Sequence, residues 1–166
     1  RPLAEGLRET LGPLRRALPS PVQTNWRVHV RDPRTGQRGI RFVTNAIDGE
    51  PLPVYGNGRN TRDWLHVDDH CDALLTLLEF PGIEGETFNI GAQHELDVLT
   101  ITSTLLGLLG KPDTLIRHVE DRPGHDRRYA VDSSKLTRVT GWKPQVTFAE
   151  GIAQTVRWFQ ANEAWW

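Results

Sequence analysis

Asp121-Arg-Pro-Gly-His-Asp-Arg-Arg-Tyr129 is the stretch that decides how this 166-residue chain is interpreted, because it gathers an anion-binding composition into one turn. The Pro-Gly pair at its centre predicts a tight turn between two strands. Such a turn directs its basic side chains toward a shared point, namely Arg122, His125 and Arg127 or Arg128. Guanidinium groups bind phosphate oxygens through paired, charge-assisted hydrogen bonds, and histidine can donate another. The stretch is a candidate anion site, with a solvated basic loop as the alternative interpretation.

A second turn, Tyr55-Gly-Asn-Gly-Arg-Asn-Thr-Arg62, has the same character. Its two glycines allow the backbone to approach a ligand closely, and Arg59 and Arg62 place positive charge beside them. An ordinary glycine-rich hairpin is the alternative, and the stretch does not match the Gly-x-Gly-x-x-Gly pattern of dinucleotide binding. Because two phosphates need two cationic partners, the two arginine-bearing turns together predict a clamp for a pyrophosphate group.

The composition predicts one compact domain of the intracellular type. Hydrophobic residues make up 37% of the chain and charged residues 25%, a balance that supports a hydrophobic core. The single cysteine, Cys71, excludes an internal disulfide and fits a reducing compartment. The sequence has neither a secretion signal at its start nor an apolar run of about 20 residues, the length that crosses a membrane. We therefore expect a cytoplasmic protein without a membrane partner.

Positive charge is concentrated at the start of the chain, although the net charge is only −1. Residues 1–41 contain nine arginines against three acidic residues, and five prolines that leave one short predicted helix, from about Ala4 to Leu11. An arm that binds nucleic acid is the alternative interpretation, but Trp26 is the only aromatic residue among these arginines. We predict that residues 1–39 form a basic leader foreign to the domain, and that nucleic acid is not a partner.

Regular periodicity begins after Gly39 and predicts an α/β domain over residues 40–166. Apolar residues recur at helical spacing over 42–47, 73–78, 98–109 and 148–159, and a short helix is predicted at 132–141. Strands are predicted at 52–55, 87–90, 116–119 and 129–131. Several polar residues are predicted to cap the helices that follow them: Asp68 or Asp69, Asp97, and Thr147 in a capping box with Glu150.

Metal binding and nucleophilic catalysis are alternatives that the sequence disfavours. His66-Val-Asp-Asp-His70 places two histidines four residues apart, a spacing that can bind zinc from one helix face. However, Val67 replaces the glutamate of the protease signature, and a helix that starts at Asp68 leaves His66 outside it. No Gly-x-Ser-x-Gly elbow is present, and Ser133-Ser134 fit a helix start. We therefore predict neither a metal ligand nor a catalytic nucleophile.

Residues 40–166 resemble the C-terminal portion of the dTDP-glucose 4,6-dehydratase family, which are extended short-chain dehydrogenases/reductases of the NAD-dependent epimerase/dehydratase type. The resemblance rests on Asp121–Tyr129 and on five further stretches: Pro53-Val-Tyr-Gly-Asn-Gly58, Arg62-Asp-Trp-Leu-His-Val-Asp-Asp-His70, Thr87-Phe-Asn-Ile-Gly91, Gly141-Trp-Lys-Pro144 and Trp165-Trp166. It implies a two-lobed α/β fold, in which this part is the C-terminal substrate-binding lobe and an N-terminal Rossmann core binds NAD. Most members of the family are homodimers that convert dTDP-glucose to dTDP-4-dehydro-6-deoxy-glucose.

The resemblance implies that five residues contact the substrate, a dTDP-sugar. Pro53 and Tyr55 would line the thymine pocket. Arg62 and Arg122 would hold the diphosphate, and His125 would assist near the phosphates.

The catalytic and cofactor-binding patterns of the family are not found in these 166 residues: Gly-x-x-Gly-x-x-Gly, Tyr-x-x-x-Lys and the Thr-Asp-Glu triplet. The resemblance therefore implies no catalytic and no NAD-binding residue in this chain. We expect the isolated chain to be inactive, because side chains cannot replace a nicotinamide. In addition, Glu95 stands near the place of a family asparagine, where its carboxylate would repel a diphosphate.

Two hypotheses of function follow from this resemblance. The first is a truncated or split dehydratase that depends on a separate N-terminal Rossmann half. The second is a non-catalytic module that binds nucleotide sugars or another protein. In both, the face that normally packs on the Rossmann core is expected to be apolar and to favour self-association.

Overall fold

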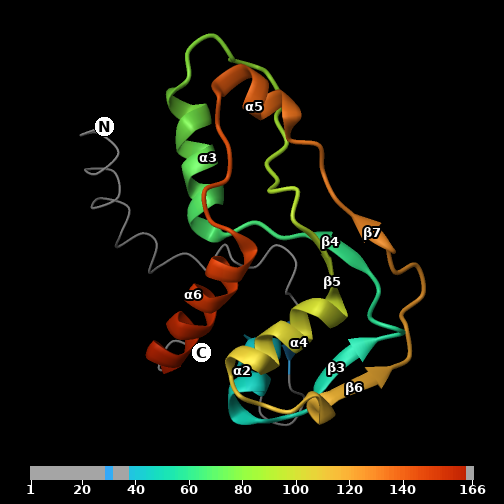
Figure 1. Ribbon diagram of the computed structural model, residues 1–166. Coiled ribbons are helices and arrows are strands. Elements are labelled where there is room, and N and C mark those ends of the chain that lie inside the picture. Colours follow the sequence, from blue (N-terminus) through green and yellow to red (C-terminus); the bar gives the residue numbers. More distant parts are fainter. Residues whose placement is uncertain (1–28, 32–37, 164–166) are drawn as a thin grey trace.

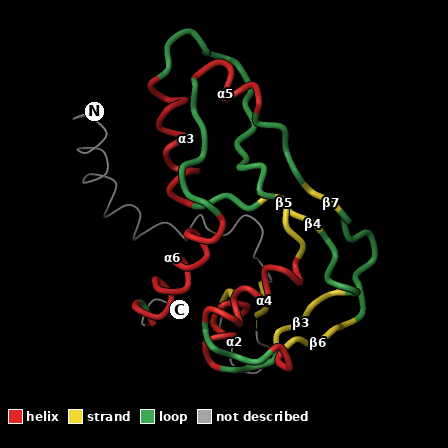
Figure 2. Tube along the Cα trace, in the orientation of Figure 1, coloured by secondary structure: helices red, strands yellow, loops and turns green. Residues whose placement is uncertain are grey.

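The computed structural model describes residues 29–31 and 38–163 (Figure 1). In chain order the elements are β1 (His29–Arg31), β2 (Arg38–Ile40), α2 (Arg41–Asp48), β3 (Leu52–Tyr55), β4 (Thr61–Asp63), α3 (Val67–Glu79), β5 (Glu95–Asp97), α4 (Val98–Leu108), η2 (Asp113–Leu115), β6 (Ile116–Val119), β7 (Arg128–Tyr129), α5 (Ser134–Thr140) and α6 (Phe148–Ala161). Figure 2 shows how helices and strands alternate, which confirms the predicted α/β class. The helix predicted at 4–11 and the pair Trp165-Trp166 lie outside the described residues.

The strands of the described residues form three small sheets. β1 pairs with β2 in antiparallel orientation. β3 runs parallel to β6, with Leu52 opposite Ile116 and Tyr55 opposite Val119. β4 lies between antiparallel β5 and parallel β7. Because β3 and β6 are parallel, the chain leaves both strands at the same end, and the two segments that follow are brought together there.

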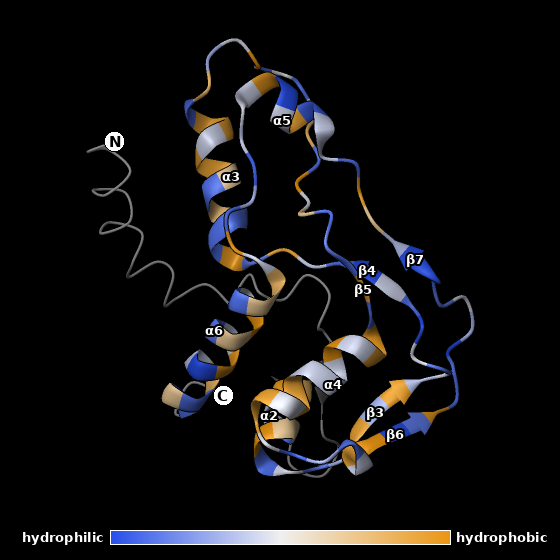
Figure 3. Cartoon of the chain, in the orientation of Figure 1, coloured by the Kyte–Doolittle hydropathy of each residue, from blue (hydrophilic) through white to orange (hydrophobic). Residues whose placement is uncertain are grey.

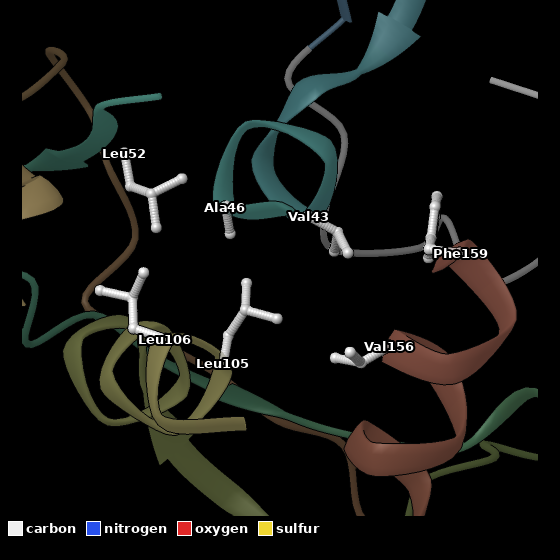
Figure 4. Close-up of a cluster of buried hydrophobic side chains, with 7 residues drawn as sticks. All are labelled: Val43, Ala46, Leu52, Leu105, Leu106, Val156 and Phe159. Atoms are coloured by element: carbon white, nitrogen blue, oxygen red, sulfur yellow. The ribbon is translucent and has the colours of Figure 1, made fainter. Parts of the chain in front are cut away.

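The main hydrophobic core lies between α2, α4 and α6, and we call it the α2–α4–α6 core. Figure 4 shows its buried side chains: Val43, Ala46, Leu52, Leu105, Leu106, Val156 and Phe159. Residues three apart lie on one helix face, so α2 contributes Val43 with Ala46 and α6 contributes Val156 with Phe159. Burial of each leucine side chain stabilises the fold by about 1.5–3 kcal/mol.

A second, smaller hydrophobic cluster lies between α3 and α5, and we call this part the α3–α5 region. Trp142 donates from Nε1 to Asp72 Oδ2 at 3.1 Å. Asp69 is 3% exposed and accepts the backbone N–H groups of Gln145 and Val146 at 2.9 and 3.0 Å. The buried members are Ala73, Leu136 and Trp142, with Leu65, Leu77, Phe88 and Ile90 packed against them and partly buried. Polar bonds thus hold much of this region together.

Two of the predicted helix caps are confirmed. Asp97 Oδ1 accepts the backbone N–H of Thr100 at 2.7 Å at the start of α4. At the start of α6, Thr147 and Glu150 form a reciprocal capping box. These caps depend on residues three apart, so the local sequence is sufficient to predict them.

The start of α3 differs from the prediction. The helix begins at Val67, and His66 is its cap, because the ring Nδ1 accepts the backbone N–H of Asp68 at 3.3 Å. The prediction that Asp68 or Asp69 caps this helix was wrong, since both lie within its first turn. Within the described residues, no helix combines the length and the apolar character that crossing a membrane requires.

Residues 87–90 do not form the predicted buried strand. No strand in the described part of the chain bonds to this segment. Instead, one side chain bonds to its backbone, and one of its own side chains bonds to the backbone of the segment before α5. Lys135 Nζ donates to the carbonyl of Thr87 at 2.8 Å, and Asn89 Nδ2 donates to the carbonyl of Asp132 at 3.3 Å. The apolar residues of this segment do pack against the protein, as their pattern indicates. A strand also needs a partner strand, and the sequence of the segment alone does not show whether one is present. The strand predicted at 129–131 likewise shortens to β7, Arg128–Tyr129.

Candidate functional site

The two arginine-bearing turns lie against each other. The first turn (residues 56–60) follows β3, and the second turn (residues 120–127) follows β6, on the side of the molecule away from α6 (Figure 1). Gly56 N donates to the carbonyl of Val119 at 2.9 Å, and Thr61 N donates to the carbonyl of Arg127 at 2.8 Å. Figure 3 shows that the second turn is hydrophilic along its length. The two turns are therefore adjacent, as a clamp built from both would require.

Three side chains meet where these turns begin. The ring of His125 lies edge-on to Tyr55, with centroids 6.1 Å apart, and donates from Nδ1 to Asp121 Oδ1 at 2.6 Å. This bond is the main cause that lowers the pKa of Asp121, with desolvation acting against it and the backbone N–H of Arg122 adding to it. The His125 side chain is only 11% exposed. Because Asp121 holds Nδ1, the ring orientation is fixed and Nε2 is the nitrogen that can contact a ligand.

Two glycines allow the first turn to adopt this shape. Gly56 has a φ of +54°, and a Cβ added there would lie 3.0 Å from Asp121 Oδ2. Gly58 has a φ of +70°, and its Cβ would lie 2.7 Å from Val54 Cγ1. Both positions combine left-handed backbone with close packing, so glycine is the residue that fits. Gly56, which is predicted to allow close approach to a ligand, allows close approach of Asp121 in this structure.

Four of the five predicted contacts lie around this point. Leu52 and Val54 point into the core, so Pro53 and Tyr55 share the opposite face of β3. Arg122 lies in the second turn with its side chain exposed, and its backbone N donates to Asp121 Oδ1 at 2.9 Å. Tyr55 and His125 are in direct ring contact, as described above.

Arg62 stands apart from the other predicted contacts. It lies on β4, where it is paired with Leu96 of β5 and Tyr129 of β7, and its Nη1 donates to the carbonyl of Thr61 at 2.7 Å. Among the described residues, no hydrogen bond, ion pair or ring contact joins Arg62 to Pro53 or to the three residues at the turns. The structure thus divides the predicted site between two neighbouring sheets.

A pocket of about 280 Å³ opens between the two turns. It is lined by Asn57, Arg59, Asn60, Asp121 and Arg127. The sequence marks the two arginines as charges in turns but gives no reason to choose them over their neighbours. Asn60 is missed because its amide bonds to the carbonyl of a residue 66 positions away, which no local pattern contains.

Arg128 is engaged in a bidentate ion pair with Glu95. Its Nε and Nη2 donate to the two carboxylate oxygens at 2.6 and 2.7 Å. The hydrogen bond from Arg128 is the main cause that lowers the pKa of Glu95, so this carboxylate is ionised at neutral pH. Its charge is paired, which offsets the repulsion of a diphosphate that the sequence predicts. In turn, the charge of Arg128 is paired with a carboxylate of the same chain.

The two histidines around α3 have structural contacts. His66 caps the helix, and its carbonyl accepts the backbone N–H of His70 at 3.0 Å. Asp69, between them, is committed to the segment that precedes α6. Among the described residues, no three side chains of His, Cys, Asp or Glu gather closely enough to hold a metal ion.

Comparison with known proteins identifies what this chain is similar to. The model of the GDP-mannose 4,6 dehydratase family matches residues 25–155, so the match begins within the segment predicted as a leader. A dTDP-glucose 4,6-dehydratase of Actinoplanes sp. is 50% identical over 125 residues, which cover 75% of this chain and 39% of that protein.

Solved structures of the same kind of enzyme are similar in fold. One, from Streptomyces venezuelae with NAD and TYD bound, has 46% identity and a TM-score of 0.71, over 75% of this chain and 38% of that one. Another, from Bacillus anthracis in complex with NAD, has 45% identity and a TM-score of 0.70, over 75% and 39%. The chain therefore spans less than two fifths of the length of these relatives.

Proposed function

Because this chain belongs to the GDP-mannose 4,6 dehydratase family, we propose that residues 40–166 are the nucleotide-sugar-binding lobe of a dTDP-glucose 4,6-dehydratase. The lobe binds dTDP-glucose, and conversion to dTDP-4-dehydro-6-deoxy-glucose requires a complementary NAD-binding half. The similarity to dehydratases at 45–50% identity supports the substrate class. The relatives with NAD bound support the cofactor of the complete enzyme.

The contact between Tyr55 and His125 carries the proposal. Tyr55 offers an aromatic ring on the exposed face of β3, which suits stacking on a base. His125 is oriented by Asp121, and the charge of Arg122 acts on the same carboxylate. An aromatic surface beside cationic donors matches a nucleoside diphosphate, which has a flat base at one end and negative charge at the other.

The remaining two contacts complete the proposed substrate site. Pro53 lies two residues before Tyr55 on the same face of β3 and extends the apolar surface for thymine. Arg62, on the neighbouring sheet, is the second cation for the diphosphate. Its bond to the Thr61 carbonyl uses Nη1, so other donors of the guanidinium remain for a phosphate.

The starts of α3, α4 and α6 do not fit the pyrophosphate of NAD. A dinucleotide pyrophosphate is held by free N–H groups at a helix start that follows a glycine-rich loop. At α3, α4 and α6, side chains of His66, Asp97 and Thr147 already accept such N–H groups. We therefore assign NAD, which supplies the hydride acceptor when bound, to the complementary half.

A candidate surface for that half lies on the α3–α5 region. Leu74 and Leu78 of α3 are 45% and 82% exposed. Nearby, residues 87–90 pack by one face and have no strand partner among the described residues. An exposed apolar helix face beside an unpaired extended segment suits a protein partner. In the absence of that partner, the same surface favours self-association.

Calorimetric titration with dTDP tests the proposal. We expect saturable binding to the wild-type chain, and Arg122→Ala and Arg62→Ala to weaken it by about tenfold or more, since each removes a charge-assisted contact. Arg157→Ala is the matched control, because Arg157 is an exposed arginine on α6, away from the turns. Absence of binding by a chain whose circular dichroism shows it to be folded would contradict the proposal.

A non-catalytic binding module is the second candidate, because the contact between Tyr55 and His125 offers a binding surface that needs no NAD. The two candidates differ in what happens when the missing half is supplied. The chain can be mixed with the N-terminal half of a dTDP-glucose 4,6-dehydratase, NAD and dTDP-glucose, and formation of the 4-dehydro product can be measured. Product above that of the N-terminal half alone supports the split enzyme, whereas dTDP binding without any product supports the module.

A further inference from the structure

The pocket between the two turns is lined by Asp121, which orients His125, and by four residues to which neither the resemblance nor the proposed function assigns a role: Asn57, Arg59, Asn60 and Arg127. Its volume is about 280 Å³, slightly below the range of roughly 300–1,000 Å³ that is typical for pockets of drug-sized ligands. The pocket therefore suits a small group rather than a whole nucleotide sugar. Its lining contains two guanidiniums, two carboxamides and one carboxylate.

The two guanidiniums of the pocket have no ion-pair partner in the described part of the chain. Arg128, the next residue after Arg127, shows the contrast, because both of its bonding edges are occupied by Glu95. Arg59 lies close enough to Asp97 to lower the pKa of that carboxyl, although the main influences there are desolvation and the bonds to Thr100. Asp97 is committed to capping α4, so it does not neutralise Arg59 by direct contact.

The pocket is held in shape by buried and backbone bonds. Asn60 is 6% exposed, and its Nδ2 donates across the pocket floor to the carbonyl of Asp126 at 3.0 Å. Thr61 N donates to the carbonyl of Arg127, which fixes the backbone of that arginine. Asn57 Oδ1 accepts the backbone N–H of Arg59 at 3.0 Å, so its amide group remains as a donor. The backbone that carries these donors is thus positioned before any ligand arrives.

The one carboxylate of the pocket is already engaged. Asp121 accepts from His125 Nδ1 at 2.6 Å and from the backbone N–H of Arg122 at 2.9 Å, both on Oδ1. These two hydrogen bonds partly offset the negative charge of the Asp121 carboxylate. The pocket therefore presents two positive charges against one partly compensated negative charge.

We propose that this pocket is a binding site for a phosphate-type oxyanion, held by Arg59 and Arg127 with the amide of Asn57. Its residues differ from the five contacts of the proposed function, so the proposal stands whether or not that function is correct. The oxyanion is either a free phosphate or pyrophosphate, or a phosphate group carried by the nucleotide ligand.

The test is a calorimetric titration of the 166-residue chain with inorganic pyrophosphate, in a phosphate-free buffer of low ionic strength. We expect saturable binding that Arg59→Gln and Arg127→Gln each weaken by about tenfold, because each removes one charge-assisted contact. Arg157→Gln is the matched control and should bind like the wild type. Arg59→Lys should restore part of the affinity, because it keeps the charge but loses the bidentate geometry. Circular dichroism checks that every variant is folded.

A parallel titration with dTDP identifies the source of the oxyanion. Loss of both pyrophosphate and dTDP affinity in Arg59→Gln and Arg127→Gln supports the proposal, with the phosphate carried by the nucleotide. Loss of pyrophosphate affinity alone supports it with a free anion as the ligand. Pyrophosphate affinity that is absent, or equal in the wild type and both glutamine variants, overturns it. If the proposed function is wrong but the oxyanion site is real, the chain will bind pyrophosphate and will not bind dTDP.

Discussion

The α2–α4–α6 core and the α3–α5 region are built from the same kinds of element, yet they are stabilised differently. The first buries seven hydrophobic side chains contributed by three helices and β3. The second buries three, and it relies on Asp69, Asp72 and Lys135 to connect its segments through hydrogen bonds. Leucines 74 and 78 of α3 remain exposed. The comparison indicates that the first region is stabilised by its own packing. The second region leaves an apolar face of α3 exposed.

The location of the candidate site follows from this difference. Both turns are anchored by β3 and β6, which border the α2–α4–α6 core, because Leu52 of β3 is fully buried in it. The site therefore rests on the better packed region, and the surface proposed for a partner lies on the other. The proposed function therefore assigns binding of a nucleotide and docking of a complementary half to separate parts of the molecule.

Truncation of a core leucine should give the largest difference between the two regions. Leu105 is 1% exposed, so Leu105→Ala removes buried contacts and leaves a cavity, which should cost roughly 2–5 kcal/mol of unfolding free energy. Leu77→Ala removes the same atoms from the half-buried cluster and should cost about 1–2 kcal/mol. Urea unfolding followed by circular dichroism measures both. Equal losses would contradict the distinction between the regions.

Removal of the buried carboxylate should test the polar character of the α3–α5 region. Asp69→Ala leaves the N–H groups of Gln145 and Val146 without their acceptor, which should cost about 2–3 kcal/mol. Hydrogen exchange at these two amides should accelerate more than exchange within α4. Asp68→Ala is the matched control, because Asp68 is an exposed neighbour on the same turn of α3. A smaller loss for Asp69→Ala than for Asp68→Ala would refute this account.

Glycine substitution should distinguish packed from open turns. Gly58→Ala forces a left-handed backbone and a contact of 2.7 Å with Val54, so it should destabilise the chain by about 2–3 kcal/mol. Gly82 also has a positive φ, of +76°, but has no atom within 4 Å of its Cβ position. Gly82→Ala should therefore cost only about 1 kcal/mol. Thermal unfolding of the two variants gives the comparison directly.

Replacement of the most exposed leucine should have the smallest effect on stability. Leu78→Lys removes an apolar side chain that is 82% exposed, so the unfolding free energy should change by about 0.5 kcal/mol or less. Self-association, measured by sedimentation velocity, should decrease because the α3 face becomes charged. Undiminished self-association would show that a different surface is responsible.

Local patterns predicted the elements whose interactions are local. The caps at Asp97 and Thr147 and the apolar faces of α2 and α6 depend on residues three or four positions apart. The cap of α3 was missed because a histidine ring replaces the Asp or Ser side chain that usually accepts the N–H. The strand at 87–90 was mispredicted because a strand depends on its neighbour as well as on its own residues.

The candidate site was predicted in part for the same reason. Arginines and glycines mark both turns in the sequence, and the structure places the two turns against each other. His125 and Asp121 are four residues apart and lie within one turn, so their hydrogen bond is local. The contact between His125 and Tyr55 instead depends on the parallel pairing of β3 and β6. The pocket lined by Arg59 and Arg127 arises only from that pairing, so no single stretch of sequence contains it.

The pairing of β3 with β6 also determines when the site can exist during folding. It joins Leu52 to Ile116 and Tyr55 to Val119, so a long stretch of chain separates the residues that must meet. Pairing of such distant segments is slow compared with the formation of a helix such as α4. The pocket is therefore absent from any folding intermediate that lacks this pairing. An anion that binds there would stabilise the completed fold alone and leave earlier stages of folding unaffected.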